Sequence, residues 1–541
     1  MNKWLFVTFF VLAGCDTANN HQLEYTNNAV PLVDNTNPWF QSAAMQVKQK
    51  TVDVQRIQHQ MGSAKNIILF LGDGMSLTTV TAARILDGQQ QGLLGEENNL
   101  SFDGFPFSGL AKTYSVDAQV PDSASTMTAM MSGVKTDFGI VGIAESVTRG
   151  ECASQSGNEL ISALDLAELA GLSTGIVTTA RITHATPAAT YAKSPERNWE
   201  GPSKMPQQAI DSGCEDIASQ LIQYQANLNS RYQGAKSNGI EVVLGGGRRH
   251  FLPETVSAQA DKRLSGSRTD GRNLISEWQT LYPQGLFIDN RSDFEAADFS
   301  QYKHLFGLFN QTHMRFESNR QHQSQLEPSL KDMTQKAIQT LSKNPKGFFL
   351  MVEAGRIDHA HHAGNAFNAL SDTIALSQAV EVALENTDPE NTLIIVTADH
   401  GHVFTMAGYP KRGNPILGKV VSTGQSTPTL AVDNLPYTTL GYATGLGHRH
   451  LGKETDADKG YKATAHAGRA SLNGVDTTQP GFFQEALVPL ESETHSGEDV
   501  PIYATGPGAH LITGSNEQTI IFHAINYAGD LLAKAQQVLE N

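Results

Sequence analysis

The stretch Lys65–Met75, KNIILFLGDGM, places five consecutive apolar residues directly before a Gly-Asp-Gly sequence. A run of this length, rich in Ile, Leu and Phe, is typical of a strand that is buried on both faces. Four further runs of the same kind follow at 174–179, 240–244, 348–352 and 393–397. Amphipathic helical patterns separate them, for example at 158–169 and 330–341. The alternation predicts an α/β fold with a largely parallel central sheet and helices on both faces.

The alternation is interrupted at residues 408–480, which are rich in Gly, Thr, Pro and Lys and contain no clear buried strand. We expect an inserted subdomain or a long surface excursion there, and the sheet pattern resumes near Pro501. The predicted parts of the chain are a leader (1–15), a tether with an N-terminal helical arm (16–60), an α/β core (61–407), an insertion (408–485) and a C-terminal part of the core (486–541).

The first 15 residues are typical of an export leader. Lys3 precedes an apolar run, 4–14, that is shorter than the roughly 20 helical residues needed to span a bilayer. The run ends in Leu-Ala-Gly-Cys at 12–15, which resembles a bacterial lipobox, whose Cys becomes the lipidated first residue of the mature protein. We expect an exported, periplasmic or cell-surface lipoprotein anchored through Cys15. An ordinary cleaved signal with a chance Cys is the alternative.

The chain of 541 residues carries 39 Lys and Arg against 55 Asp and Glu, a formal net charge of −16. This excess of negative charge repels nucleic acid and anionic membranes, so we expect no nucleic-acid binding and membrane contact only through the lipid anchor. An anionic substrate would need a local positive site. Two further cysteines, Cys152 and Cys214, are expected to form a disulfide in an oxidising compartment; two buried free thiols are the alternative.

Polar side chains with metal-binding groups follow four of the predicted strands. They are Asp73, the pair His184 and Thr186, Glu353, and the group Asp399, His400 and His402. Ligands of an open parallel sheet bind beyond the carboxyl ends of its strands, so we expect these side chains at one edge. A single acidic residue at a strand end is usually a cap or a turn former, and the inference therefore depends on the coincidence of four.

Asp358 and His362 lie four residues apart and would share one face of a helix. Carboxylate and imidazole together suit zinc, and buried ionisable groups are costly without a compensating cation; a polar turn at a helix start is the alternative. The clustered carboxylates predict more than one ion, and two zinc ions would form a clamp for phosphoryl transfer. Ser123 is a candidate nucleophile near a helix N-terminus, where anions are favoured, although Asp122 or Ser123 could simply be the N-cap.

These residues resemble the alkaline phosphatase family. The matching segments are, in family order, 65–75, 122–124, 183–187, 197–199, 353–362, 397–400 and 493–499. Residues 37–40 and 197–199 are more similar to the animal tissue branch than to the enterobacterial branch. The resemblance implies hydrolysis of phosphate monoesters to alcohol and inorganic phosphate through a phosphoserine intermediate, at a site of two zinc ions and one magnesium ion. It also implies a homodimer that is inhibited by its product, phosphate.

The resemblance assigns a role to each candidate residue and adds Arg197 and His495, which spacing alone does not identify. The implied zinc ligands are Asp358, His362 and His495 at one site and Asp73, Asp399 and His400 at the other. The implied magnesium ligands are Asp73, Thr186 and Glu353. Ser123 is the implied nucleophile and Arg197 the implied bidentate phosphate clamp, while His184, His359 and His402 lie beside the ligands. The Cys152 to Cys214 spacing matches the animal branch.

Calcium, which the animal branch binds at an extra site, is doubtful as a cofactor of this chain. The corresponding stretch has Phe309-Asn310 and Glu327 and lacks a match to the first acidic ligand. A sulfatase is the nearest alternative, but its nucleophile is followed by x-Pro-x-Arg, whereas Ala-Ser-Thr follows Ser123. A phosphodiesterase usually has Thr at the nucleophile position. A catalytically silent binding lipoprotein is opposed by the intact Ser123 and ligand set.

If Cys15 carries the lipid, replacing Cys15 with Ser removes the attachment site. The Cys15→Ser protein should therefore leave the membrane fraction and appear in the soluble fraction, which immunoblotting of separated fractions measures. A mature N-terminus elsewhere in the chain would contradict this prediction.

Overall fold

The computed structural model describes residues 63–540 apart from 257–264, 323–325, 463 and 467, together with residues 38, 41–45, 47–49 and 52. The chain divides into two compact units, Met1–Gln55 and Arg56–Asn541. In the first unit every described residue is helical. The predicted leader, Cys15 and residues 16–37 of the tether lie outside the described residues. No helix among the described residues is both long and apolar enough to cross a membrane.

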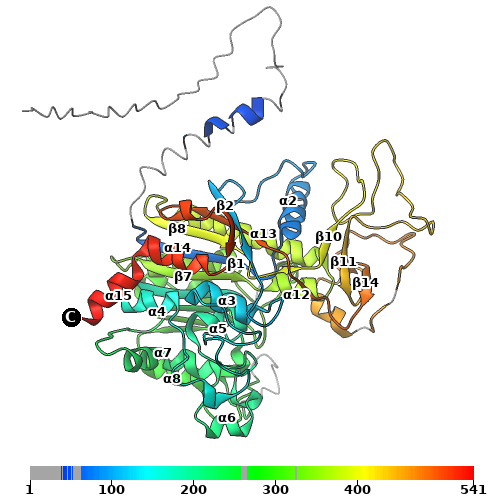
Figure 1. Cartoon of the computed structure of the whole chain (residues 1–541). Coiled ribbons are helices and arrows are strands. Elements are labelled where there is room, and N and C mark those ends of the chain that lie inside the picture. Colours follow the sequence, from blue (N-terminus) through cyan, green and yellow to red (C-terminus); the bar gives the residue numbers. More distant parts are fainter. Residues whose placement is uncertain are drawn as a thin grey trace, which may run out of the picture. The chain divides into compact units, whose positions relative to one another are not determined.

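A ten-stranded sheet forms the centre of the second unit (Figure 1). In sheet order its strands are β17 (Gly514–Glu517), β2 (Phe107–Lys112), β16 (Val500–Thr505), β8 (Thr392–Thr397), β1 (Asn66–Gly72), β7 (Phe348–Ala354), β3 (Ser173–Arg181), β4 (Val242–Gly246), β6 (Leu305–Leu308) and β5 (Leu286–Ile288). All neighbouring pairs are parallel except the two that β16 makes, with β2 and β8. The predicted, largely parallel α/β fold is confirmed.

The predicted apolar runs form the central strands because helices cover the sheet. One group consists of α2 (Leu77–Gln90), α11 (Leu330–Leu341) and α13 (Ala366–Asn386); α13 contacts the other two helices, and α11 and α13 contact strands of the sheet. Another consists of α3 (Ser123–Ser132), α4 (Ala163–Leu169), α5 (Ala185–Tyr191) and α14 (Ile520–Gly529). Between them β7 and β8 are buried at every position. Strands shielded in this way lose the alternation of polar and apolar residues, as the sequence of β1 shows.

Helix starts depend on capping residues as well as on apolar spacing. The helix predicted at 330–341 has these bounds in the structure, and Ser329 with Asp332 forms a capping box before it. The helix predicted at 158–169 was wrong at its start, because α4 begins at Ala163. Ser162 and Asp165 form a capping box there, which fixes the N-terminus five residues later than the apolar pattern indicates.

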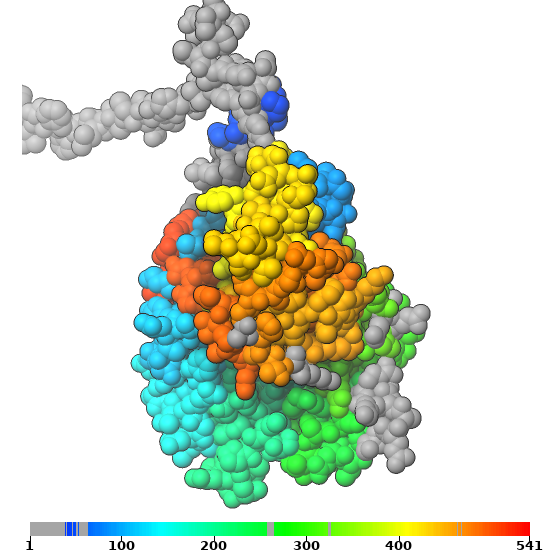
Figure 2. All heavy atoms as spheres, turned by 90° about the vertical axis from the view of Figure 1, so that its right-hand side faces the viewer, coloured from blue at the N-terminus to red at the C-terminus, as the bar shows by residue number. Residues whose placement is uncertain are grey.

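The insertion contains strands that the sequence did not reveal. β11 (Leu440–Gly445) lies between β10 (Phe404–Met406) and β14 (Ala486–Pro489) in a three-stranded sheet. β12 (Arg449–His450) pairs with β13 (Phe482–Phe483). Within 408–480, β11 buries Leu440 and Tyr442 but leaves the position between them partly exposed, and its Gly and Thr residues give it a weak apolar pattern. Figure 2 shows the insertion, yellow to orange, as a continuous layer on the face turned to the viewer.

Cys152 and Cys214 form a disulfide with an S–S distance of 2.08 Å across 62 residues of sequence. Replacing both with Ser removes a constraint on the unfolded chain, and a loop of this size corresponds to about 4 kcal/mol in the chain-entropy model. The double variant should lose about that much free energy of unfolding, measured by denaturant titration. Equal unfolding midpoints for both proteins, or two alkylatable thiols in the native protein, would contradict the prediction.

Candidate active site

The carboxyl ends of neighbouring strands bring the predicted acidic residues to one edge of the sheet. In the sheet register Leu71 of β1 lies beside Glu353 of β7 and Thr397 of β8. Asp73 and Asp399 follow these positions at a distance of two residues, so their carboxylates gather near that of Glu353. All three acidic residues are 0% exposed. The fold therefore concentrates negative charge in its interior, at the edge where ligands of parallel sheets bind.

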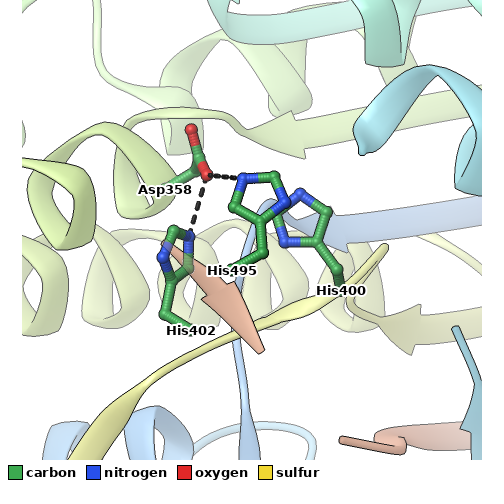
Figure 3. Close-up of side chains that lie close together, drawn as sticks. All are labelled: Asp358, His400, His402 and His495. Carbon is green, nitrogen blue, oxygen red and sulfur yellow. Dashed lines mark hydrogen bonds and ion pairs between the residues drawn. The ribbon is translucent and has the colours of Figure 1, made fainter. Parts of the chain in front are cut away.

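Asp358, His362 and His495 form what we call the first metal cluster. Asp358 Oδ1 lies 3.2 Å from His362 Nε2 and 3.4 Å from His495 Nε2, and the two imidazole nitrogens are 3.1 Å apart. Asp358 and His362 share a face of α12 (Arg356–His362), as their spacing predicted. His495 comes from β15 (His495–Ser496), which pairs in antiparallel fashion with β9 (Gly401–His402). In Figure 3 His495 and His402 both point toward Asp358.

Asp73, Asp399 and His400 form the second metal cluster. His400 Nε2 lies 3.4 Å from Asp73 Oδ1 and 3.2 Å from Asp399 Oδ2. The His400 ring stacks on the His495 ring with centroids 3.6 Å apart, so the first and second clusters adjoin (Figure 3). Two cation sites side by side are thus available from separate sets of side chains.

Asp73 also takes part in the third metal cluster, together with Thr186 and Glu353. Ligand atoms of Asp73, Glu353 and His184 lie within 4.8 Å of one another. Thr186 is 0% exposed, and its hydroxyl has no hydrogen-bond partner in the protein. Glu353 Oε2 accepts a hydrogen bond from the hydroxyl of Thr178 on β3. Carboxylate and hydroxyl oxygens are hard donors of the kind that magnesium prefers.

Four carboxylate oxygens in the second and third clusters have no hydrogen-bond partner in the protein. Both oxygens of Asp73, Oε1 of Glu353 and Oδ2 of Asp399 accept no hydrogen bond. Burial, together with the Asp399 carboxylate and its acidic neighbours, raises the pKa of Asp73 well above its usual range. Burial also raises the pKa of Glu353 to about 8. Because ionised carboxylates so placed require compensating positive charge, the three donor sets fit divalent metal ions.

Ser123 is the first residue of α3, and its Oγ lies 3.1 Å from His400 Nε2. Asp122 is the N-cap of this helix and accepts a hydrogen bond from the Ser125 N–H at 3.1 Å. Arg197 Nη1 donates to the other Asp122 oxygen at 2.8 Å. The capping role of Asp122 thus coexists with a serine that faces the second cluster. Asp122 also links Arg197, the predicted phosphate clamp, to the helix that begins at Ser123, the predicted nucleophile.

Glu493 is a residue to which the sequence analysis gave no role. It is 1% exposed and accepts hydrogen bonds from His402 Nδ1 at 2.5 Å and from the Val403 N–H at 2.9 Å. His402 Nε2 in turn lies 2.8 Å from Asp358 Oδ1. Burial lowers the pKa of His402, but Glu493 and Asp358 outweigh it and raise the pKa to about 10. Glu493 therefore orients His402, which orients a ligand of the first cluster. Its only sequence signal is its place two residues before His495.

Three histidine side chains, His184, His313 and His359, lie close together near Arg197 and the third metal cluster. His184 Nε2 lies 3.3 Å from Arg197 Nη2, and the rings of His359 and His313 lie 4.0 Å apart. His313 was not predicted. Burial, with help from Arg356, lowers the pKa of His359 to about 3, so this ring is neutral. Arg197 carries a positive charge beside these neutral rings, close enough to attract the Asp73 carboxylate.

In the stretch that corresponds to the calcium site of the animal branch, the buried carboxylate of Glu327 has hydrogen-bond partners and a positively charged partner within the protein. Glu327 is 0% exposed, and its carboxylate accepts hydrogen bonds from Asn310 Nδ2 at 2.5 Å and from the Arg315 N–H at 2.8 Å. Arg315 also pairs with it through Nη1 at 2.5 Å. The guanidinium supplies the positive charge that a buried carboxylate requires.

Comparisons with known proteins agree with this arrangement. The family model for alkaline phosphatase matches residues 64–531. The tissue-nonspecific isozyme of alkaline phosphatase from Gallus gallus is 44% identical over 490 residues, covering 89% of this chain and 88% of the relative. The same isozyme from Homo sapiens is 40% identical, covering 93% and 90%. These identities confirm the resemblance to the animal tissue branch.

Solved structures show the same fold. The alkaline phosphatase of Thermus thermophilus superposes with a TM-score of 0.59 at 23% identity, covering 88% of this chain and 96% of that structure. The alkaline phosphatase of the Antarctic bacterium TAB5 superposes with a TM-score of 0.56 at 22% identity, covering 87% and 99%.

Exhaustive chelation should abolish activity and lower stability together, because the carboxylates repel one another once compensating cations leave. An ion present at about 1,000 times its Kd contributes about 4 kcal/mol to the free energy of unfolding. Thermal unfolding and phosphatase activity, followed before and after dialysis against chelator and again after metal is restored, measure both effects. Activity that survives dialysis would contradict a metal centre.

Proposed function

The chain belongs to the alkaline phosphatase family and hydrolyses phosphate monoesters, and we propose that it does so with Ser123 as the nucleophile at a centre of two zinc ions and one magnesium ion. The observation that carries this proposal is the position of Ser123 Oγ, 3.1 Å from His400 Nε2 at the N-terminus of α3. The serine is therefore within reach of the second metal cluster and lies where helix N–H groups favour an anion.

We assign the two zinc ions to the first and second metal clusters and the magnesium ion to the third. Carboxylate with imidazole suits zinc, and the oxygen donors of Thr186 and Glu353 suit magnesium. When bound, such ions stabilise the charge on attacking and leaving oxygens and lower the pKa of hydroxyl groups and water. The positive charge they bring also allows an acidic chain to bind an anionic substrate.

Ser123 Oγ forms a bond to phosphorus, and the ester oxygen leaves as the alcohol. Water then attacks the phosphoserine, which returns the serine hydroxyl and releases inorganic phosphate. Arg197 presents its guanidinium fork to two phosphate oxygens, and its ion pair with Asp122 holds the fork beside Ser123. Because Asp122 caps the helix that Ser123 begins, clamp and nucleophile keep a fixed relation through both displacements.

We further propose export with a lipid anchor at Cys15, assembly as a homodimer and inhibition by product phosphate. The leader sequence supports the first of these, and the family resemblance supports the other two. Calcium has no place in the proposal, because Arg315 neutralises the buried Glu327.

Ser123→Ala should remove the phosphoenzyme and lower kcat by at least about 10³-fold, since loss of a nucleophile removes the covalent route. Zinc content should stay near that of the wild type, because the metal clusters keep all their ligands. Burst kinetics with a chromogenic phosphomonoester and metal analysis check both points. Ser132→Ala on the same helix is the control, since Ser132 Oγ donates to the Thr128 carbonyl away from the clusters. A burst of equal amplitude in wild type and Ser123→Ala would refute the assignment.

His184→Asp should raise magnesium affinity, because a carboxylate adds an oxygen ligand beside the third cluster, where His184 now offers a neutral ring with an unpartnered Nδ1. His359→Lys serves as the comparison: it should tighten phosphate inhibition by adding positive charge and leave magnesium affinity unchanged. Magnesium activation curves and phosphate inhibition constants for both variants measure the difference. Unchanged values in both would remove the support for a role of these two residues.

A further inference from the structure

The insertion contacts α12, the short helix that carries Asp358 and His362. Arg356 begins this helix and is 2% exposed. Its guanidinium lies 3.8 Å from the centroid of the Phe316 ring, and its Nη2 lies 2.7 Å from Asp458 Oδ2. Asp458 belongs to the insertion, on the 3-10 segment Ala457–Lys462. A buried guanidinium requires a carboxylate partner, so the insertion neutralises the charge at the start of α12.

Two further hydrogen bonds join the insertion to the other end of α12. Tyr461 Oη donates to the His359 carbonyl at 2.9 Å. Arg449 Nη2 donates to the Ala363 carbonyl at 3.0 Å, and its guanidinium lies 4.5 Å from the centroid of the Phe483 ring. Carbonyls at a helix C-terminus lack partners within the helix and take them from elsewhere. The insertion provides the donor for the Ala363 carbonyl and a second donor for the His359 carbonyl, which also accepts from the Ala363 N–H at 3.1 Å.

An apolar cluster separate from the main core connects the same parts. Its members, each at most 1% exposed, are Phe316, Ala360, Ala363, Ala369, Ala457 and Phe483. Ala457 and Phe483 come from the insertion, and Ala360 comes from α12. The face of α12 turned away from the metal ligands is thus packed against residues of the insertion.

We propose that the insertion is the support that fixes α12, with Asp458 and Tyr461 as positioning residues that hold Asp358 and His362 in place for zinc. The proposal rests on the proposed function, since it takes the first metal cluster to be a zinc site. α12 has seven residues, too few to be stable as a helix by itself, so its position depends on tertiary contacts. Residues that orient metal ligands from outside the coordination shell affect metal affinity about 10- to 100-fold.

The expected effect of losing Asp458 lies at the low end of that range. The Asp458 side chain is 50% exposed. Asp456 and Asp372 are also close enough to attract the Arg356 guanidinium electrostatically. Tyr461→Phe removes a single hydroxyl and keeps the ring. The two changes together remove a contact at each end of α12 without altering a metal ligand.

The test compares Asp458→Asn, Tyr461→Phe and the double variant with the wild type, all loaded with zinc. The rate of zinc transfer to a colorimetric chelator is the main readout, and kcat and KM for a chromogenic phosphomonoester are the second. Asp433→Asn is the matched control, because Asp433 pairs with Arg469 at 2.7 Å within the insertion. Asp458→Glu is the conservative variant that should restore slow zinc release.

We expect zinc release about 10-fold faster in the double variant, with a fall in kcat and little change in KM, and wild-type behaviour in the control. Each single variant should show a smaller effect. Wild-type release rates in the single and double variants, or equal acceleration by Asp433→Asn, would overturn the proposal. A wild-type chain that retains no zinc would instead contradict the proposed metal centre, and the role of the insertion with it.

Discussion

Mutual repulsion of buried carboxylates is the constraint on which the rest of the structure depends. Asp73, Glu353 and Asp399 are 0% exposed at the edge of a parallel sheet, and Asp358 lies beside them. Both oxygens of Asp73, Oε1 of Glu353 and Oδ2 of Asp399 lack hydrogen-bond partners in the protein, and the neighbouring carboxylates repel one another. Such a group of anions is unfavourable in a protein interior unless cations neutralise it. The fold thus provides the negatively charged donor groups, and divalent cations would neutralise them.

Two kinds of contact position the groups of the site. The strands of the sheet place the carboxylates, and buried charged pairs orient the arginine and histidine side chains. The register of strands β1, β7 and β8 brings the carboxylates of Asp73, Glu353 and Asp399 to the same edge of the sheet. Asp122 joins Arg197 to the helix of Ser123, and Glu493 joins His402 to Asp358. Each of these acidic residues orients another side chain, so the geometry of the site depends on contacts outside it.

The parts of the fold and site that the sequence predicts are those with strong local signals. Short apolar runs predict the buried strands, and an amphipathic pattern predicts α11. Asp73, Glu353 and Asp399 could be identified because each stands at or just after the carboxyl end of such a run. α4 begins later than predicted because a local cap outweighs the apolar pattern. His495 could be reached only through the family resemblance, since it lies on a two-residue strand whose place depends on pairing with β9. The partnership of Arg356 with Asp458 spans 102 residues, and no local pattern indicates it.

The most direct test of the account is anomalous diffraction at the zinc absorption edge from crystals of the active enzyme. The account predicts two anomalous peaks, one among Asp358, His362 and His495 and one among Asp73, Asp399 and His400. At the third cluster it predicts density without a zinc signal. Crystals of fully active enzyme without an anomalous peak at either of the first two clusters would contradict it.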